Sequence, residues 1–219
     1  MHRLLFEKTG NAIWISHLDL MRLFQRAFKR AGLSLTHTQG YSPKPSVSIA
    51  MPLSVGVESV CELLDFDLEG DAVSDDEIVA RLNQGLVEGV RVLSAYCDGQ
   101  KIINLSLLHC QVNLEYDSGI PENADLLLRE LFTRHSLIVP KKSKNGIQEQ
   151  DIIPLIKRLD FIRAGEQELI LDCVVCCQNP TLNPMQIVAA IELHLPAMKP
   201  DFAKCRRIEI FDLNENVFR

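Results

Sequence analysis

The sequence contains no apolar run that approaches the roughly 20 residues needed to cross a bilayer as a helix. It also lacks a signal-peptide pattern, because the segment from His2 to Glu7 alternates around Leu4 and Phe6 as a strand does. No glycine-rich phosphate loop, nucleophile elbow or metalloprotease helix motif occurs. These absences predict a cytoplasmic protein with no membrane contact, and they leave no complete catalytic motif from which a reaction could be identified.

Positive charge is scarce, because 23 Lys and Arg residues stand against 29 Asp and Glu residues and give a net charge of -6. This balance argues against a protein that coats DNA through bulk positive charge, and it leaves a local basic patch open. Hydrophobic residues make up 47% of the 219 residues, enough for one large domain or two of about 100 residues each.

The seven cysteines are an odd number in a chain expected to stay in the cytoplasm, so we expect free thiols. Cys173 and Cys176 have the Cys-x2-Cys spacing of many zinc sites. In a strand, however, these two thiols point to opposite faces, and no second ligand pair accompanies them. The sequence therefore predicts buried free thiols, no metal site and no cofactor.

Hydrophobic periodicity and turn residues predict the element order β-α-β-β-α-β twice along the chain. The elements expected in the first half are strands at 2–7, 33–38, 60–68 and 90–96, extended runs at 12–15 and 46–51, and helices at 16–31 and 74–86. Those expected in the second half are strands at 107–116, 137–140, 152–162, 168–177 and 206–213, and helices at 121–135 and 183–194. The sequence thus predicts an α+β fold of two tandem ferredoxin-like (βαββαβ) modules with antiparallel sheets, at residues 1–98 and 104–219.

The helix expected at 16–31 carries a row of positive charges on its outer side. Ser16 followed by Asp19 resembles a capping box, and Gly32 supplies a stop. A helical wheel separates an apolar side from a basic side, which holds Arg22, Arg26, Lys29 and Arg30. Such side chains could bind the phosphates of a nucleic acid. The alternative is a solvated helix face on which Asp19 pairs with Arg22.

Two loops extend this hypothesis. In the segment 39–45, Gly40 permits close backbone approach, Tyr41 could stack on a base, and Lys44 is held between two prolines. Lys141, Lys142 and Lys144 form a second basic loop that could touch a phosphate backbone. A rigid turn and a solvated hairpin tip are the respective alternatives.

His17 is the one candidate for a catalytic side chain. It lies in the first turn of the predicted helix, where an imidazole could act as a general base or bind an anion. The wheel places it on the apolar side, which favours a hydrogen-bonded, structural histidine instead.

Several motifs together resemble the bacterial radical SAM-linked proteins, a domain family of unknown function found beside or fused to radical S-adenosylmethionine enzymes. The motifs are Ile15-Ser-His-Leu-Asp-Leu-Met-Arg22, Arg30-Ala-Gly-Leu33, Gln39-Gly-Tyr-Ser-Pro-Lys-Pro45 and Gly56-Val-Glu-Ser59. The resemblance implies a radical S-adenosylmethionine enzyme as partner, in an RNA or ribosome-related setting. The chain lacks the Cys-x3-Cys-x2-Cys spacing that holds such an enzyme's cluster, so it would be the partner of the radical generator.

Three functional hypotheses follow. The first is an accessory RNA-binding or RNA-modification-associated protein that acts with a radical S-adenosylmethionine enzyme and is not an enzyme on its own. The second is an enzyme subunit for RNA processing or modification, in which Ser16, His17 and the Gly40-Tyr41 loop complete an active site. The third is a protein–protein interaction module that binds no nucleic acid.

Overall fold

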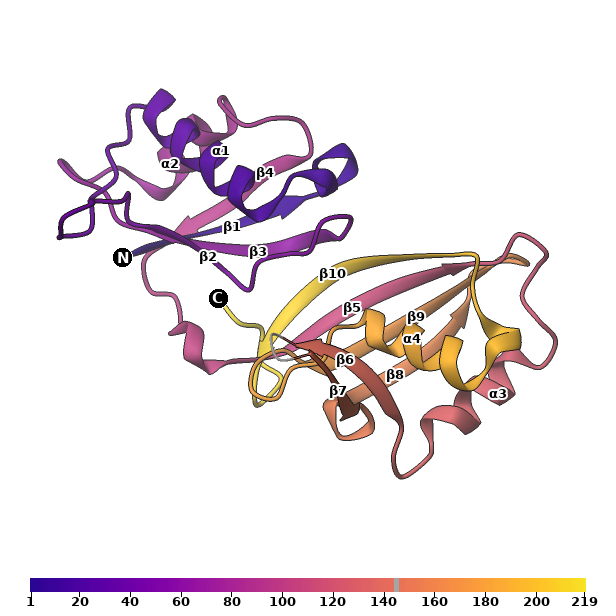
Figure 1. Cartoon of the computed structure of the whole chain (residues 1–219). Helices are drawn as coiled ribbons and strands as arrows, with labels where there is room; N and C mark the ends of the chain where they lie inside the picture. Colours follow the sequence, from indigo (N-terminus) through magenta and orange to yellow (C-terminus); the bar gives the residue numbers. More distant parts are fainter. Residues whose placement is uncertain (144–145) are drawn as a thin grey trace. The chain divides into compact units, whose positions relative to one another are not determined.

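The structure, a computed structural model, describes residues 1–143 and 146–219 of the chain. Lys144 lies outside the described residues, as does the side chain of Lys142. The chain divides into two compact units (Figure 1). The first contains Met1–Ile102 together with Arg219, and the second contains Ile103–Phe218.

The first unit combines an antiparallel sheet with two α-helices. Its elements are β1 (His2–Lys8), the 3-10 helix η1 (Gly10–Trp14), α1 (His17–Arg30), β2 (Val47–Ala50), β3 (Glu58–Phe66), α2 (Asp75–Asn83) and β4 (Val90–Tyr96). The strands lie in the order β4-β1-β3-β2, and each neighbouring pair is antiparallel. Both helices cover the same face of this sheet (Figure 1).

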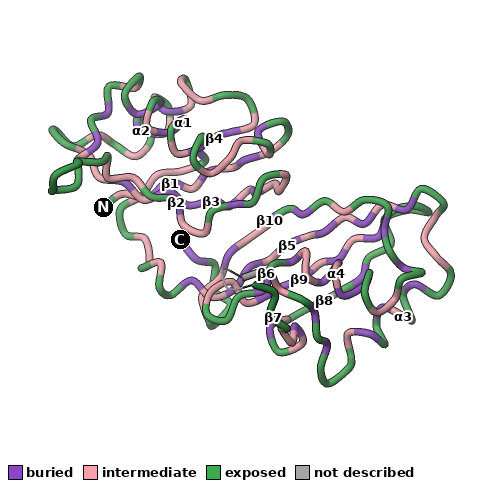
Figure 2. The backbone as a smooth tube through the Cα atoms, in the orientation of Figure 1, coloured by how far each residue is buried: buried purple, intermediate pink, exposed green. Residues whose placement is uncertain are grey.

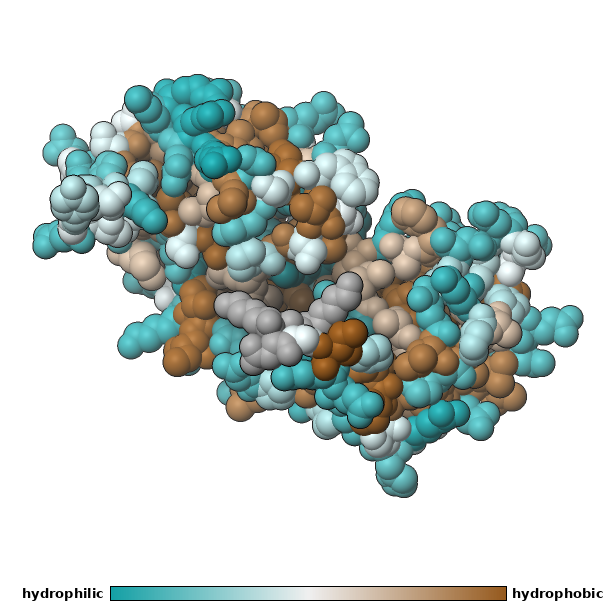
Figure 3. Space-filling view, in the orientation of Figure 1, coloured by the Kyte–Doolittle hydropathy of each residue, from teal (hydrophilic) through white to brown (hydrophobic). Residues whose placement is uncertain are grey.

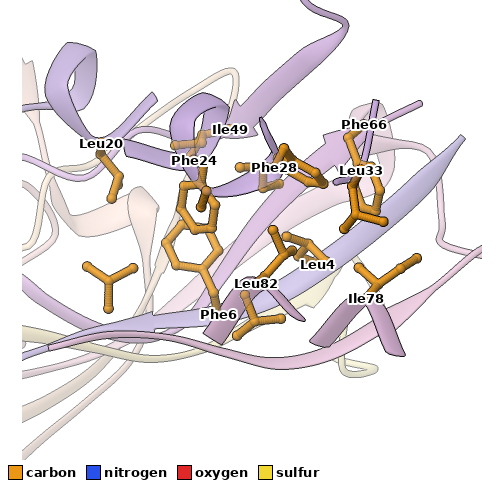
Figure 4. Close-up of a cluster of buried hydrophobic side chains, with 14 of the residues drawn as sticks. Leu4, Phe6, Leu20, Phe24, Phe28, Leu33, Ile49, Phe66, Ile78 and Leu82 are labelled. Carbon is orange, nitrogen blue, oxygen red and sulfur yellow. The ribbon is translucent and has the colours of Figure 1, made fainter. Parts of the chain in front are cut away.

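An aromatic core joins α1 to the sheet (Figure 4). Phe24 and Phe28 lie one turn apart on the buried side of the helix, and neither is accessible to solvent. Phe24 meets the ring of Phe6 edge-on with centroids 4.8 Å apart, and Phe28 meets Phe66 at the same separation. Because the apolar positions of α1 recur at helical spacing, burying them fixes which side of the helix faces solvent.

The start of α1 is held by polar contacts. The Ser16 hydroxyl accepts a hydrogen bond from the Asp19 backbone N–H, as a helix N-cap does. Below it, the buried Lys8 ammonium donates to the carbonyl oxygens of Ile13 and Ile15. Burial lowers the pKa of Lys8, although the charge of Glu62 acts in the opposite direction.

The second unit has the same kind of sheet with a separate hairpin. Its elements are β5 (Leu105–Glu115), α3 (Ala124–Phe132), β6 (Ile138–Ser143), β7 (Gly146–Asp151), η3 (Ile153–Leu155), β8 (Ile156–Arg163), β9 (Glu168–Cys176), α4 (Met185–His194), η4 (Pro196–Met198) and β10 (Phe202–Asp212); η2 (Ile102–Asn104) precedes β5. The strands β10-β5-β9-β8 lie in this order with antiparallel neighbours. β6 and β7 pair only with each other among the described strands.

The prediction of an α+β fold with antiparallel strands is confirmed, and buried positions run along the strands of both units (Figure 2). Three local predictions were wrong. The segment 33–38 forms only isolated bridges, which join Leu35 to Leu68 and His37 to Pro45. The segment 12–15, expected to be extended, belongs largely to the 3-10 helix η1. The strand expected at 137–140 belongs to the β6-β7 hairpin and not to the larger sheet.

The expectation of free thiols holds for all seven cysteines, which form no disulfide; Cys97 is exposed, in contrast to the buried Cys173. Among the described residues, no helix combines the length and the apolar content that crossing a membrane requires.

Candidate nucleic-acid interface

Four cationic side chains lie on the solvent side of α1, and we call them the basic stripe. They are Arg22, Arg26, Lys29 and Arg30, all of them exposed. Their position follows from the buried residues Leu20, Phe24, Ala27 and Phe28, which occupy the opposite side of the helix. In the space-filling view, hydrophilic side chains gather over α1 and α2, with hydrophobic ones beside them (Figure 3). The outward orientation predicted by the wheel is therefore observed.

One member of the basic stripe is paired with an acid. The Arg22 Nη1 atom lies 3.0 Å from Asp19 Oδ1, and both side chains are more than half exposed. The Ser16 hydroxyl donates to the other carboxylate oxygen of Asp19 at 2.7 Å. The hydrogen bond from Ser16 and then that from Arg22 lower the pKa of Asp19, so it is ionised at neutral pH.

The rest of the basic stripe is available to an external anion. Arg26, Lys29 and Arg30 form no ion pair with any of the residues that the structure describes. Arg30 Nε donates only a long hydrogen bond of 3.4 Å to the carbonyl oxygen of Arg26. The alternative of a solvated helix face on which Asp19 pairs with Arg22 fits these positions as well, because that pair is present and the other three cations are exposed.

The segment 37–45, which we call the Tyr41 loop, has a fixed base and an exposed tip. The Thr38 N–H donates to the Lys44 carbonyl oxygen at 2.8 Å, and the Lys44 N–H donates to the Thr38 hydroxyl at 3.0 Å. At the tip, Gly40 has a φ of +145° and the Tyr41 side chain is fully exposed. An aromatic ring on a braced loop is poised to stack on a planar group.

A cavity of about 390 Å³ lies between the C-terminal half of α1 and the base of the Tyr41 loop. It is lined by Gln25, Phe28, Lys29, Gly32, Leu33, Ser34, Leu35, His37, Pro45 and Glu69. Lys29 belongs to both the basic stripe and this cavity, so the fold brings a cation, a hollow and the Tyr41 loop together. The sequence analysis missed Gln25, His37 and Glu69, because only the folded chain brings their three segments together.

The second predicted basic loop, with Lys141, Lys142 and Lys144, differs from the basic stripe because one of its lysines makes an internal hydrogen bond. Lys141 lies in β6 of the second unit, and its ammonium group donates to the Thr181 carbonyl oxygen at 3.1 Å. The side chain of Lys142 and the whole of Lys144 fall outside the described residues. The side-chain contact described for these three lysines is therefore an internal one, made by Lys141.

His17 is the first residue of α1, and its Nδ1 atom is buried with no hydrogen-bond partner among the described residues. The expected hydrogen bond at this atom is therefore not seen. The Tyr41 loop lies beside the other end of α1, where Lys29 lines the cavity. The twelve helical steps from His17 to Lys29 span about 18 Å, so the fold does not bring His17 and the loop into one active site.

Comparisons with solved structures show a likeness of fold. A chain in the crystal structure of a Cbf5-Nop10-Gar1 complex matches with a TM-score of 0.50 and 10% identity, over 95% of this chain and 48% of that chain. This chain thus spans about half the length of that relative. The structure of an unknown protein from Galdieria sulphuraria matches over 94% of this chain and 96% of that chain with 11% identity and a TM-score of 0.27.

Sequence comparison identifies the family without assigning a function. No curated protein matches the chain. One family model, described as an uncharacterized protein conserved in bacteria (DUF2344), matches residues 2–184 of the 219. Because this match covers most of the chain, the protein belongs to the DUF2344 family of uncharacterized bacterial proteins.

Proposed function

We propose that the protein binds single-stranded RNA through the basic stripe and the Tyr41 loop, as an accessory protein of RNA modification. One observation carries this proposal. In a chain with a net charge of -6, three exposed cations of α1 form no ion pair with the residues that the structure describes. One of them, Lys29, lines a cavity at the base of the braced Tyr41 loop, whose tyrosine is fully exposed. A cationic track beside a stacking platform is the usual composition of single-strand binding surfaces.

The basic stripe supplies the sequence-independent part of the binding. From Arg22 to Arg30 the helix advances about 12 Å, so the stripe can follow several phosphates of one strand. Arginine offers a planar fork of donors that matches a phosphate, and each contact releases counterions. Binding should therefore weaken steeply as the salt concentration rises.

The Tyr41 loop favours a single strand over a duplex. Stacking on Tyr41 requires an unpaired base, which a duplex does not offer. The adjacent cavity of about 390 Å³ has a volume within the range of small-molecule sites, and a nucleobase would fit there beside Lys29 and His37.

We also infer that each unit is a ferredoxin-like module. The strand orders β4-β1-β3-β2 and β10-β5-β9-β8 support this, because they are equivalent once the β6-β7 hairpin is treated as an insertion between α3 and β8. Modules of this kind frequently present sheet or loop surfaces to RNA, and that general association is in keeping with the proposal.

The proposed protein partner is a radical S-adenosylmethionine enzyme. The resemblance of the motifs in residues 15–59 to radical SAM-linked proteins supports this partner, and the missing Cys-x3-Cys-x2-Cys spacing assigns the radical chemistry to another chain. The test is the absorbance ratio at 260 and 280 nm of the co-purified pair, measured before and after nuclease treatment. It distinguishes a pair that contains bound RNA from a pair held together by protein contacts alone. A pair that forms but contains no nucleic acid would favour the interaction-module hypothesis.

The enzyme-subunit hypothesis rests on a single observation, the unpartnered Nδ1 atom of His17. If His17 is catalytic, His17→Ala should abolish RNA processing by the complex and leave the melting temperature within a few degrees. A loss of folding in the same variant would assign His17 a structural role.

Charge reversal tests the RNA-binding proposal directly. Arg26→Glu combined with Arg30→Glu should abolish the binding of an unstructured RNA oligonucleotide at low salt, measured by fluorescence anisotropy. The control, Lys101→Glu with Arg134→Glu, changes two exposed cations outside α1 and shifts the net charge by the same amount. Equal affinity in both double variants would remove the basis of the proposal.

A further inference from the structure

Three residues from separate segments of the first unit place their ligand atoms in one cluster. His2 begins β1, Asp75 is the first residue of α2, and Cys97 directly follows β4. Their imidazole nitrogen, carboxylate oxygen and thiol sulfur all lie within 4.8 Å of one another. Imidazole, carboxylate and thiolate are the three side-chain ligand types of zinc.

The separations suit a tetrahedral metal ion. His2 Nδ1 lies 3.1 Å from Cys97 Sγ and 3.9 Å from Asp75 Oδ1. Zinc bonds of about 2.0 to 2.3 Å in a tetrahedron place neighbouring donor atoms about 3.3 to 3.7 Å apart. Small rotations of the Cys97 and Asp75 side chains, of which Asp75 is 43% exposed, therefore suffice to seat the ion.

The same distances argue against a nucleophilic triad. In a cysteine–histidine–carboxylate triad the thiol and the carboxylate contact opposite nitrogens of the imidazole. Here both the sulfur of Cys97 and the oxygen of Asp75 lie beside Nδ1 of His2. The convergence of the three ligand atoms on one point is typical of a metal site and not of a proton relay.

The surroundings hold two of the ligands in place. The ring of Phe66 stacks on His2 with centroids 5.3 Å apart and an interplanar angle of 25°, which restricts rotation of the imidazole. Ser74 caps α2 by accepting from the Glu77 N–H, so Asp75 is not needed for that role. Asp75 Oδ1 is buried without a hydrogen bond among the described residues. An unsatisfied buried oxygen calls for a partner such as a cation.

The charges around the cluster also favour binding of a cation, although the positive end of the α2 dipole acts against it. Asp76 and Glu77 follow Asp75 in the chain, and Asp98 follows Cys97. Glu77 is paired with Arg81, so Asp76 and Asp98 are the two carboxylates that add negative charge beside the cluster and favour a cation there.

We propose that His2, Asp75 and Cys97 bind one divalent transition metal ion, with zinc as the best match and a fourth position open to water. A nitrogen, oxygen and sulfur donor set in tetrahedral arrangement selects zinc or cobalt over the hard cations magnesium and calcium. The sequence analysis predicted no metal site, because ligands at positions 2, 75 and 97 have no recognisable spacing. This site is independent of the proposed RNA binding.

Cobalt is a suitable probe, because a thiolate bound to Co²⁺ gives a charge-transfer band and tetrahedral geometry gives strong visible bands. The full chain, with a tag that contains no histidine, is treated with chelator and reductant, dialysed and titrated with Co²⁺. We expect one ion per chain and displacement by Zn²⁺. Cys97→Ser should remove the charge-transfer band. Asp75→Asn should weaken the cobalt affinity at least about tenfold, because even mutating the hydrogen-bond partner of a metal ligand typically costs about 10- to 100-fold.

Two matched controls keep the test specific. Asp76→Asn removes an adjacent acid of the same helical turn, and Cys176→Ser removes a thiol outside the cluster. Both should keep the thiolate band, and neither should weaken cobalt binding as far as Asp75→Asn does. The proposal is overturned if the parent chain gives no thiolate band, or if the band survives in Cys97→Ser with circular dichroism showing both proteins folded. Should Cys97→Ser fail to fold, unchanged affinity in folded Asp75→Asn overturns the proposal equally.

Discussion

Asp19 and Arg22 face each other across one turn of α1, with 3.0 Å between the carboxylate oxygen and the guanidinium nitrogen. Asp19 is held in this position because Ser16 donates a hydrogen bond to its second oxygen. The pair is well exposed, so an incoming phosphate would compete with Asp19 for Arg22. Asp19 would therefore lower the affinity of the proposed RNA contact at Arg22.

Replacing this acid should strengthen RNA binding. Asp19→Asn leaves the Ser16 hydroxyl free to accept from the backbone N–H of residue 19 and releases Arg22 for one further phosphate. The slope of log affinity against log salt should then become steeper by about 0.7, the value for one added contact to a single strand. Asp76→Asn makes the same charge change on α2 and should leave the slope as it was. An identical slope in both variants would contradict a role for Arg22.

Tyr41 should contribute to affinity without contributing to stability. Tyr41→Ala removes a stacking surface and should weaken RNA binding by about 1 to 3 kcal/mol, whereas Tyr41→Phe retains the ring and most of the affinity. Because the side chain is fully exposed, neither change should move the melting temperature appreciably. If Tyr41→Phe binds RNA as weakly as Tyr41→Ala does, the contact depends on the tyrosine hydroxyl and not on stacking of the ring.

Helix α1 could be predicted from the sequence because its determinants are local. The Ser16 cap, the Gly32 stop and the recurrence of Leu20, Phe24 and Phe28 all lie within 17 residues, and the basic stripe follows as the complementary face. The segment 33–38 could not be predicted in the same way. Its bridges depend on partners such as Leu68, more than 30 residues away, and isolated pairs do not extend into a strand.

The sites that the sequence did not reveal share the same physical cause. The cavity beside α1 requires Gln25, His37 and Glu69 to meet, and the proposed metal cluster requires three segments that span the whole first unit. The periodicity and the residue spacing of the sequence do not indicate these sites, because their residues come together only when distant segments pack in the folded chain. A sequence motif reports a site only where one continuous segment supplies most of its ligands.

Phe24 should be a principal source of stability in the first unit. Its ring is inaccessible to solvent and meets Phe6 edge-on at 4.8 Å, so Phe24→Ala should lower the free energy of unfolding by about 3 to 5 kcal/mol. Leu18→Ala, on the same helix but 65% exposed, is the control and should change it by less than about 0.5 kcal/mol. Urea denaturation measures both, and similar losses in the two variants would contradict the assigned core.

Asp151 should make stability depend on pH at the base of the β6-β7 hairpin. Its Oδ1 atom accepts hydrogen bonds from the backbone N–H groups of Leu137 at 2.9 Å and Ile153 at 3.2 Å. The bond from Leu137 is the main reason that the pKa of Asp151 lies below its ordinary value of 3.8, even though partial burial acts in the opposite direction. A lowered pKa in the folded state means that the ionised carboxylate stabilises the fold.

This contribution is therefore fully present above the unfolded-state pKa of 3.8 and is lost as the pH falls through the lower folded-state pKa. Asp151→Asn keeps an acceptor oxygen but removes the charge, so it should melt below the parent protein at neutral pH. The gap in melting temperature should stay constant down to about pH 5 and narrow progressively below pH 3.8, as the parent carboxylate becomes protonated. An equal gap at pH 5 and well below pH 3.8 would mean that the variant melts lower because of altered hydrogen-bond geometry and not because of the lost charge.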